Sequence, residues 1–371
     1  MSQSAIHAIT MPKWGMAMDE GTVTAWHREV GSAVAAGDEV VDAESTKAVA
    51  GIESSVSGIL RRIVAGPGDI VPVGGLIGVI ASPDIPEDEI ERFVAAYARP
   101  SAAPDSIAAP APERLLVGER HLNVLRTGEG PASVLFIHGF GGDLSSWQLN
   151  QPVLAGLPCR TIAFDLPGHG LSDPDVGGGT LADLVLAVRG LIHELALERP
   201  HLVGHSLGGA IAAALATANP ARFASVSLIA SAGLGDEIDG DYLRGFLAAR
   251  RRNDLRPAVT RLFADERFVT RAMLEDLVRM KRIDGIEQAL IRIAGSCFPS
   301  GRQAGWGLRA GLLSLPIPTQ VIWGDQDRII PVEHAAAFTR STVIEGAGHM
   351  VHIEKAARVN DLLCRFIAGE P

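Results

Sequence analysis

Three sequence features are scarce or missing in this chain of 371 residues, and each absence excludes a class of protein. Only three cysteines occur, and none forms a C-x-x-C pair, which argues against a disulfide framework or a thiolate metal site. No stretch approaches the roughly 18 uninterrupted apolar residues of a membrane-spanning helix. The first ten residues lack a basic start followed by an apolar run, so no secretory signal is expected. We therefore expect a cytoplasmic protein without membrane contact or bound metal.

Basic side chains are also in deficit. The formal net charge is −10, and residues 1–112 hold 7 basic against 15 acidic side chains. Nucleic acid is disfavoured as a partner, because phosphate contacts need clustered lysine and arginine. Residues 234–315 are the exception, with 14 basic against 11 acidic side chains. The extra basic side chains either bind a phosphorylated substrate or belong to an ordinary solvated helix surface.

The length predicts at least two domains, and the first is expected to be all-β over residues 1–82. Its short apolar runs are separated by glycines, a pattern typical of strands joined by turns. Gly37-Asp38-Glu39-Val40 recurs as Gly68-Asp69-Ile70-Val71, which predicts a small sandwich built from two similar halves. Residues 40–44 and 48–53 are predicted to pair as a hairpin with Lys47 in its turn. A turn lysine projects into solvent, where a modifying enzyme and other active sites reach it.

Residues 83–113 contain six prolines and many alanines, which predicts a semi-rigid, extended linker. Within it, residues 86–99 have the spacing of one short amphipathic helix. Ile90, Phe93, Val94 and Tyr97 fall on one face of that helix. The face either docks on a partner subunit or packs on one of the chain's own domains.

Residues 114–371 alternate strand-like and helix-like patterns, as a doubly wound, mainly parallel sheet requires. The predicted strands are residues 134–137, 161–164, 201–203, 226–229 and 319–323. A largely helical, arginine-rich stretch at about residues 234–310 interrupts the alternation. We expect it to form a cap over the carboxyl ends of the strands, where open α/β sheets bind ligands.

Gly204-His205-Ser206-Leu207-Gly208 follows one of these strands and precedes a helix-like run of small residues. Small residues at both glycine positions allow a tight strand-to-helix turn that presents the serine hydroxyl as a nucleophile. Backbone N–H groups at the start of the following helix would lie near developing negative charge. This context favours a nucleophile elbow over a chance match in a loop.

A serine nucleophile needs a base and a carboxylate that orients the base. His349 is the predicted base, in a glycine-rich turn after the strand-like residues 341–344. Asp327 is the predicted carboxylate, just past the strand of residues 319–323, and Asp325 competes with it at this spacing. His138-Gly139-Phe140-Gly141-Gly142 completes the set, because the backbone N–H groups of Phe140 and Leu207 are positioned to form an oxyanion hole. Three further histidines are expected to be structural or surface residues: His169, His205 and His352.

These motifs, with Asp165-Leu-Pro-Gly-His-Gly-Leu-Ser-Asp173, resemble the α/β-hydrolase superfamily over residues 114–371. The chain order Ser206, Asp327, His349 is also that of the superfamily. Residues 1–82 resemble the lipoyl domain of 2-oxo-acid dehydrogenase complexes, through Met11-Pro-Lys-Trp-Gly-Met16 and Glu44-Ser-Thr-Lys47-Ala48. Biotin carriers share that fold, but their lysine normally lies between methionines, so lipoate is favoured on Lys47.

A lipoyl domain joined to an α/β-hydrolase domain resembles the dihydrolipoamide acetyltransferase components of acetoin-cleaving dehydrogenase systems. The resemblance implies transfer of an acetyl group from lipoyl-Lys47 through Ser206 to coenzyme A. It also implies two partners, a thiamin-dependent acetoin dehydrogenase component and the flavoprotein dihydrolipoamide dehydrogenase. Two alternatives stay open: a thioesterase or ester hydrolase with a tethered carrier, and a swinging-arm subunit whose hydrolase fold only docks its neighbours.

Overall fold

The computed structural model describes residues 6–12, 20–44, 49–54, 56–98 and 110–370. The chain divides into two compact units, residues 1–109 and 110–371. Among the described residues, no helix has both the length and the apolar character needed to cross a membrane. The first unit is built mainly from strands, and the second combines strands and helices.

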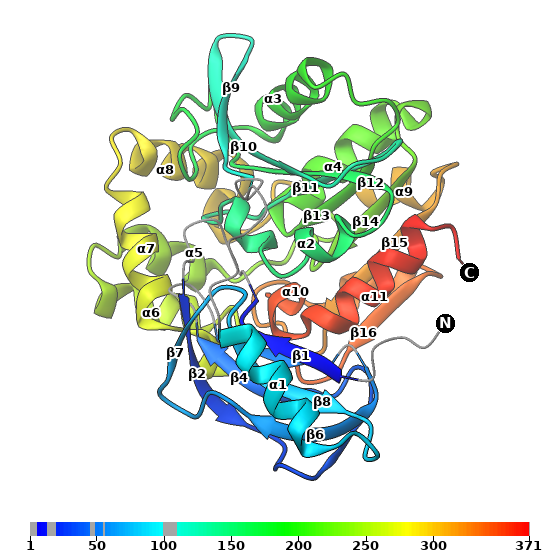
Figure 1. Cartoon of the computed structure of the whole chain (residues 1–371). Coiled ribbons are helices and arrows are strands. Elements are labelled where there is room, and N and C mark those ends of the chain that lie inside the picture. The colour runs from blue at the N-terminus through cyan, green and yellow to red at the C-terminus, as the bar shows by residue number, and fades with distance from the viewer. Residues whose placement is uncertain (1–5, 13–19, 45–48, 55, 99–109, 371) are drawn as a thin grey trace. The chain divides into compact units, whose positions relative to one another are not determined.

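The first unit contains two four-stranded antiparallel sheets (Figure 1). One sheet has the order β1 (Ile6–Thr10), β8 (Leu76–Ala81), β6 (Gly58–Ile63) and β3 (Ala33–Val34). The other has the order β5 (Val49–Glu53), β4 (Glu39–Glu44), β2 (Glu20–Trp26) and β7 (Ile70–Pro72). Fully buried side chains come from both sheets: Val23, Val41, Leu60 and Ile77. This confirms the predicted all-β sandwich.

The internal repeat corresponds to two turns with the same hydrogen bonds. Gly37 and Gly68 have φ values of +90° and +94°, a region that glycine enters without steric cost. The Asp38 carboxylate accepts from the Ala35 N–H at 3.1 Å, and the Asp69 carboxylate accepts from the Gly66 N–H at 2.7 Å. The repeated Gly-Asp therefore makes the same turn in each half of the sandwich.

Helix α1 (Glu87–Ala98) belongs to the first unit, and its apolar face packs against that unit's own strands. Ile90 is completely buried against Val79 and Ala81 of β8, and Phe93 and Val94 pack against the same cluster. The predicted linker of residues 83–113 thus contains a helix that belongs to the carrier unit. Its later part, residues 99–109, lies outside the described residues.

The second unit is built on an eight-stranded, mostly parallel sheet. Its strand order is β16 (Ser341–Ile344), β15 (Thr319–Gly324), β14 (Ser225–Ile229), β13 (His201–His205), β11 (Ala132–Ile137), β12 (Cys159–Phe164), β10 (Arg120–Thr127) and β9 (Glu113–Val117). Neighbours from β16 to β12 pair in parallel, and β10 and β9 add antiparallel edge strands. The predicted α/β-hydrolase sheet is confirmed, and the edge hairpin of β9 and β10 was not foreseen from the sequence.

Helices cover both faces of this sheet (Figure 1). One group comprises α3 (Leu181–Glu194), α4 (Leu207–Ala218) and α9 (Leu308–Leu313), and the other α2 (Gln151–Leu154), α10 (Val351–Glu354) and α11 (Ala356–Ile367). Between β14 and β15 the chain forms α5 (Gly240–Ala248), α6 (Arg252–Thr260), α7 (Arg271–Lys281) and α8 (Ile286–Cys297). These four helices occupy most of the stretch predicted to be a helical cap, and α9 at its end packs against α4 instead.

Candidate acyl-transfer site

Ser206 occupies a strained turn between β13 and α4. Its φ and ψ are 52° and −118°, a combination that costs a non-glycine residue about 1–3 kcal/mol and persists only where the surrounding structure enforces it. A Cβ atom on Gly204 would lie 2.4 Å from the carbonyl oxygen of Gly208, and one on Gly208 would lie 2.1 Å from that of Ile137. Both glycines are therefore required by backbone contacts, as the Gly-x-Ser-x-Gly spacing predicted.

His349 lies beside this turn and is held by its neighbours. The Nε2 of His205, the residue before the serine, is 3.0 Å from the carbonyl oxygen of His349. Because a carbonyl only accepts, His205 donates this hydrogen bond. The Nδ1 of His349 is 2.8 Å from Oδ2 of Asp327, and both side chains are almost fully buried. A carboxylate at Nδ1 fixes the proton there and leaves Nε2 free to act as a base.

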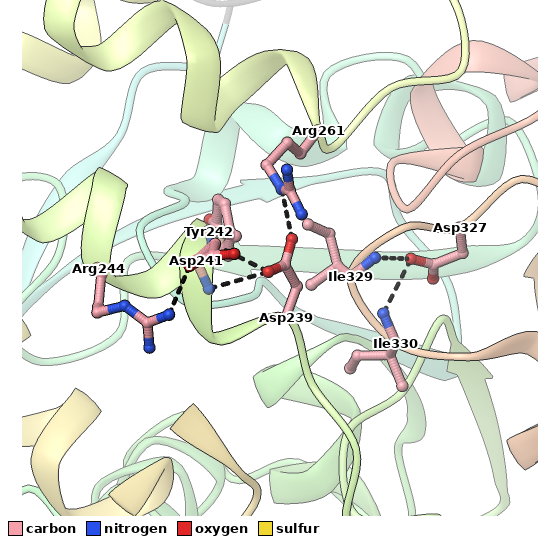
Figure 2. A network of polar contacts seen from close by, with 8 residues as sticks. All are labelled: Asp239, Asp241, Tyr242, Arg244, Arg261, Asp327, Ile329 and Ile330. Atoms are coloured by element: carbon pink, nitrogen blue, oxygen red, sulfur yellow. Dashed lines mark hydrogen bonds and ion pairs between the residues drawn. The ribbon is translucent and has the colours of Figure 1, made fainter. Parts of the chain in front are cut away.

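Asp327 is itself oriented by the backbone that follows it (Figure 2). Its Oδ1 accepts hydrogen bonds from the N–H groups of Ile329 at 2.8 Å and Ile330 at 3.0 Å. Asp325 is exposed, and its Oδ1 accepts a longer hydrogen bond of 3.3 Å from Ala347 N–H. Of the two carboxylates that the spacing left open, Asp327 is the one that contacts His349.

The cap is connected to the loop of Asp327 through Asp239 (Figure 2). The Asp239 N–H donates to the carbonyl of Ile329 at 2.8 Å. Its carboxylate forms an ion pair with Arg261 and accepts from the N–H groups of Asp241 and Tyr242 at the start of α5. The start of α5 and the loop that orients Asp327 are therefore joined by one hydrogen-bonded segment.

A second connection runs through Glu354, at the end of α10. One carboxylate oxygen accepts from the N–H groups of Ala264 at 2.8 Å and Asp265 at 3.0 Å, both in the cap. The other oxygen accepts from the N–H of Gly348 at 2.6 Å, directly before His349. Burial raises the pKa of Glu354, while these three donors oppose that shift. We assign Glu354 as a positioning residue that ties the histidine turn to the cap.

The two backbone N–H groups predicted to form the oxyanion hole come from Phe140, in the loop after β11, and from Leu207, at the start of α4. Within the described part of the chain, the N–H groups of Phe140 and Leu207 donate to no other group. A Cβ on Gly139 would lie 3.0 Å from the Ser206 Cβ, so this loop closely approaches the nucleophile. The Phe140 ring packs against Phe246 of α5 and against Phe298, with centroids 5.8 and 6.1 Å apart. The cap thus holds the oxyanion loop through aromatic contacts.

Four further histidines are buried around the site: His138, His169, His205 and His352. Of the two predicted alternatives for the last three, structural or surface residues, the surface alternative is wrong. Burial lowers the pKa of His138 to about 4 and the pKa values of His169 and His352 to about 3. His352 stacks on Trp147 and on His205, and neither of its ring nitrogens has a hydrogen-bond partner among the described residues. These rings pack as neutral aromatic groups.

The neutral state of His352 predicts a specific acid sensitivity. Its folded pKa lies below the unfolded value of about 6.5, so it contributes stability that is complete above pH 6.5 and is lost as the pH falls. Below pH 6.5, one such histidine lowers the free energy of unfolding by about 1.4 kcal/mol per pH unit, which amounts to about 2 kcal/mol at pH 5. Chemical unfolding of His352→Leu at pH 7.5 and pH 5 should therefore show about 2 kcal/mol less acid destabilisation than the unmodified protein. His193→Gln, an exposed histidine of α3, is the control, and an unchanged pH dependence in His352→Leu would contradict the assignment.

Lys47 lies outside the described residues, so its role as the lipoyl attachment site stays a prediction, and the structure describes only the strands before and after it. Strands β4 and β5 pair antiparallel, and Glu44 lies opposite Val49. Residues 45–48 therefore connect the two paired ends of one hairpin.

Two protein families match the chain. The one described as "Alpha/beta hydrolase family" matches residues 134–362, and the one described as "Biotin-requiring enzyme" matches residues 7–80. A Pseudomonas putida protein named "Dihydrolipoyllysine-residue acetyltransferase component of acetoin cleaving system" is 43% identical over 98% of this chain and 99% of its own length. A Cupriavidus necator protein of the same name is 41% identical over 97% of each chain.

Solved structures show the same fold for the second unit. A 2-hydroxy-6-oxo-6-phenylhexa-2,4-dienoate hydrolase from Rhodococcus sp. strain RHA1 matches with a TM-score of 0.62 at 23% identity, over 70% of this chain and 99% of that one. The fold and the Gly-x-Ser-x-Gly turn thus define an α/β-hydrolase-type domain, here joined to a carrier domain of the biotinyl and lipoyl class. The chain belongs to the family of dihydrolipoyllysine-residue acetyltransferase components of acetoin-cleaving systems.

Proposed function

We propose that this enzyme transfers an acetyl group from lipoyl-Lys47 to coenzyme A through an acetyl ester on Ser206. One observation supports the proposal above all: the hydrogen-bonded His349–Asp327 pair lies beside the strained Ser206 turn, in a chain whose first unit matches the biotinyl and lipoyl carrier family. The name of the family to which the chain belongs contains both parts of the proposal, an acetyltransferase activity and the dihydrolipoyllysine residue on which it acts.

Lys47 would hold the lipoyl group, which would supply the acetyl group as a thioester. The Ser206 hydroxyl gives its proton to Nε2 of His349, and its oxygen forms a bond to the acetyl carbon. The N–H groups of Phe140 and Leu207 stabilise the oxyanion, at about 3 kcal/mol for each donor. When the carbon–sulfur bond breaks, His349 returns the proton to the leaving sulfur and Ser206 keeps the acetyl group.

The second half runs the same chemistry in reverse. The thiol of coenzyme A gives its proton to His349, and its sulfur attacks the acetyl carbon of the serine ester. The bond to the Ser206 oxygen breaks, and that oxygen takes the proton from His349. Acetyl-coenzyme A and free Ser206 result, with no net change in protons or electrons. Asp327 stabilises the imidazolium that forms in each half.

As a component of an acetoin-cleaving system, the protein works with the other components of that system. We propose that these are a thiamin-dependent acetoin dehydrogenase, which loads the carrier, and dihydrolipoamide dehydrogenase, which reoxidises it. The cytoplasm is the proposed location of the reaction. Tethering the carrier to the catalytic unit provides an effective concentration up to the millimolar range.

The choice of acceptor tests the proposal. Purified protein given acetyl-dihydrolipoamide and coenzyme A should form acetyl-coenzyme A faster than free acetate. If acetate dominates and Ser206→Ala abolishes its formation, the protein is a thioesterase. If Ser206→Ala protein with lipoylated Lys47 transfers acetyl at the full rate, the hydrolase unit only docks its neighbours.

The orienting carboxylate gives a matched pair of variants. Asp327→Asn should lower the rate of acetyl transfer about 10³- to 10⁴-fold, because an amide no longer favours the Nδ1–H form of His349. Asp325→Asn makes the same change two residues away, on the exposed carboxylate, and should leave the rate near that of the unmodified protein. Steady-state acetyl-coenzyme A formation measures both. A large loss in Asp325→Asn with a small one in Asp327→Asn would reverse the assignment.

A further inference from the structure

The cap contains a pocket of about 370 Å³ that the acyl-transfer chemistry does not use. It lies between the connection from α5 to α6 and the connection from α7 to α8. Its apolar lining comes from Ala249, Val278 and Ile283. Its charged lining comprises four basic and two acidic side chains: Arg250, Arg251, Lys281, Arg282, Asp284 and Glu287. We call this the cap pocket.

The positive charge of the cap pocket is only partly neutralised. Arg250 forms an ion pair with Glu287. Arg251 and Arg282 are exposed, and neither has an ion-pair or hydrogen-bond partner on its side chain within the described ranges. Neighbouring cap arginines behave differently, since Arg252 and Arg271 both pair with Glu275. Two guanidinium groups thus remain available to an anion at this pocket.

Two helices also begin at the cap pocket without a side-chain cap. Arg251 is the N-cap residue of α6 and Gly285 that of α8, and no side chain accepts a hydrogen bond from the first N–H groups of either helix. Helices α5 and α7 begin differently, because Asp239 and Thr270 accept from their first N–H groups. Uncapped helix N-termini favour anions through their free N–H groups and their dipole. The backbone N–H groups and the unpaired guanidinium groups at this pocket therefore both favour an anionic ligand.

The cap pocket is connected to the oxyanion loop through α5. The Nζ of Lys281 donates to the carbonyls of Phe246, Leu247 and Ala249 at the end of this helix. The same Nζ lies 5.1 Å from the centroid of the Phe246 ring, which packs against Phe140. A Cβ on Gly141 would lie 2.5 Å from that same ring. Helix α5 thus contacts both a residue that lines the cap pocket and the loop that faces Ser206.

We propose that the cap pocket binds the phosphoadenosine end of coenzyme A, with Arg251 and Arg282 on its phosphates. The inference rests on the proposed function, in which coenzyme A is the acetyl acceptor. Val278 and Ile283 offer apolar surface to the adenine base, and the uncapped starts of α6 and α8 offer N–H groups to phosphate oxygens. The thiol end then extends past α5 toward Ser206. This arrangement gives the basic excess of the cap a specific role.

The test compares acceptors with and without the phosphoadenosine group. In Arg251→Ala/Arg282→Ala, the KM for coenzyme A should rise roughly 10- to 100-fold, because two charge-assisted contacts are lost. The KM for pantetheine, which has the same thiol and no phosphoadenosine, should stay within about twofold, since it makes neither contact. Arg256→Ala is the matched control, as an exposed arginine of α6 outside the pocket lining. An unchanged KM for coenzyme A in the double variant would overturn the proposal.

A binding measurement separates this proposal from the proposed function. Calorimetric titration of adenosine 3′,5′-bisphosphate into Ser206→Ala protein should show binding that the added Arg251→Ala/Arg282→Ala substitutions weaken by a similar factor. Such binding would support the cap pocket even if acetyl transfer to coenzyme A were not observed. Equal binding by both proteins would place the phosphoadenosine elsewhere, even if transfer were normal.

Discussion

Ser206→Ala is expected to lower acetyl-coenzyme A formation by roughly four to six orders of magnitude while the protein remains folded. The hydroxyl is the only atom of this residue that the mechanism uses, and alanine keeps the Cβ that the turn already accommodates. Removing a strained serine at φ 52° changes no backbone contact, so the unfolding transition should shift little. Steady-state rates with acetyl-dihydrolipoamide and coenzyme A, together with a chemical unfolding curve, measure the two effects.

A second buried serine provides the control. Ser227 lies in β14 and accepts a 2.9 Å hydrogen bond from the side chain of Gln320. Ser227→Ala should lose about 1 kcal/mol of stability, because one buried hydrogen bond is removed. Its acetyl transfer rate should stay near that of the unmodified protein. A Ser206→Ala protein that retained more than a few per cent of the rate would require another nucleophile.

Lys47→Arg is expected to abolish lipoylation and, with it, all acetyl-coenzyme A formation from acetoin by the assembled system. Arginine keeps the charge but cannot form the amide that attaches lipoate. The catalytic unit should be unaffected, so the variant should still use free acetyl-dihydrolipoamide. It would do so without the millimolar effective concentration that the tether provides. Intact-protein mass spectrometry and the coupled acetoin assay measure the two outcomes.

Lys13→Arg is the matched control for this experiment. Lys13 and Lys47 are the two lysines among residues 1–109, so the same substitution is made in the same unit. Lys13→Arg protein should carry a full lipoyl mass increment and support the coupled reaction. An increment that persists in Lys47→Arg and disappears in Lys13→Arg would move the attachment site. A biotin-sized increment would contradict the lipoyl assignment.

The sequence predicted the parts of the fold that local patterns specify. The strand-like residues 341–344 correspond to β16, and the predicted elbow lies where β13 meets α4. Short apolar runs bounded by turn residues mark buried parallel strands, because both faces of such strands are covered. The edge hairpin of β9 and β10 lacks this signal. Charged residues such as Arg114 and Arg120 interrupt it, as an exposed sheet edge allows.

Contacts between distant segments could not be predicted from one sequence. Glu354 bonds to residues about 90 positions earlier in the chain, and no local spacing connects a helix-end glutamate with the cap. The choice between Asp325 and Asp327 was open for a similar reason, because it depends on how the backbone of Ile329 and Ile330 turns back toward one carboxylate. The basic excess of the cap was visible in the sequence. That some of these basic side chains gather at two helices that begin without a side-chain cap can be seen only in the folded structure.

Tracking one acetyl group through a single turnover tests the central claim most directly. Lipoylated protein is loaded with acetyl, quenched at short times with or without coenzyme A, digested, and analysed by mass spectrometry for acetyl on the Lys47 and Ser206 peptides. Without coenzyme A, the acetyl group should move from the Lys47 peptide to the Ser206 peptide and remain there. With coenzyme A, it should leave Ser206 as acetyl-coenzyme A at the rate of product formation. Acetyl-coenzyme A that forms while the Ser206 peptide never carries acetyl, or loss of the Ser206 acetyl as acetate when coenzyme A is present, would contradict the account.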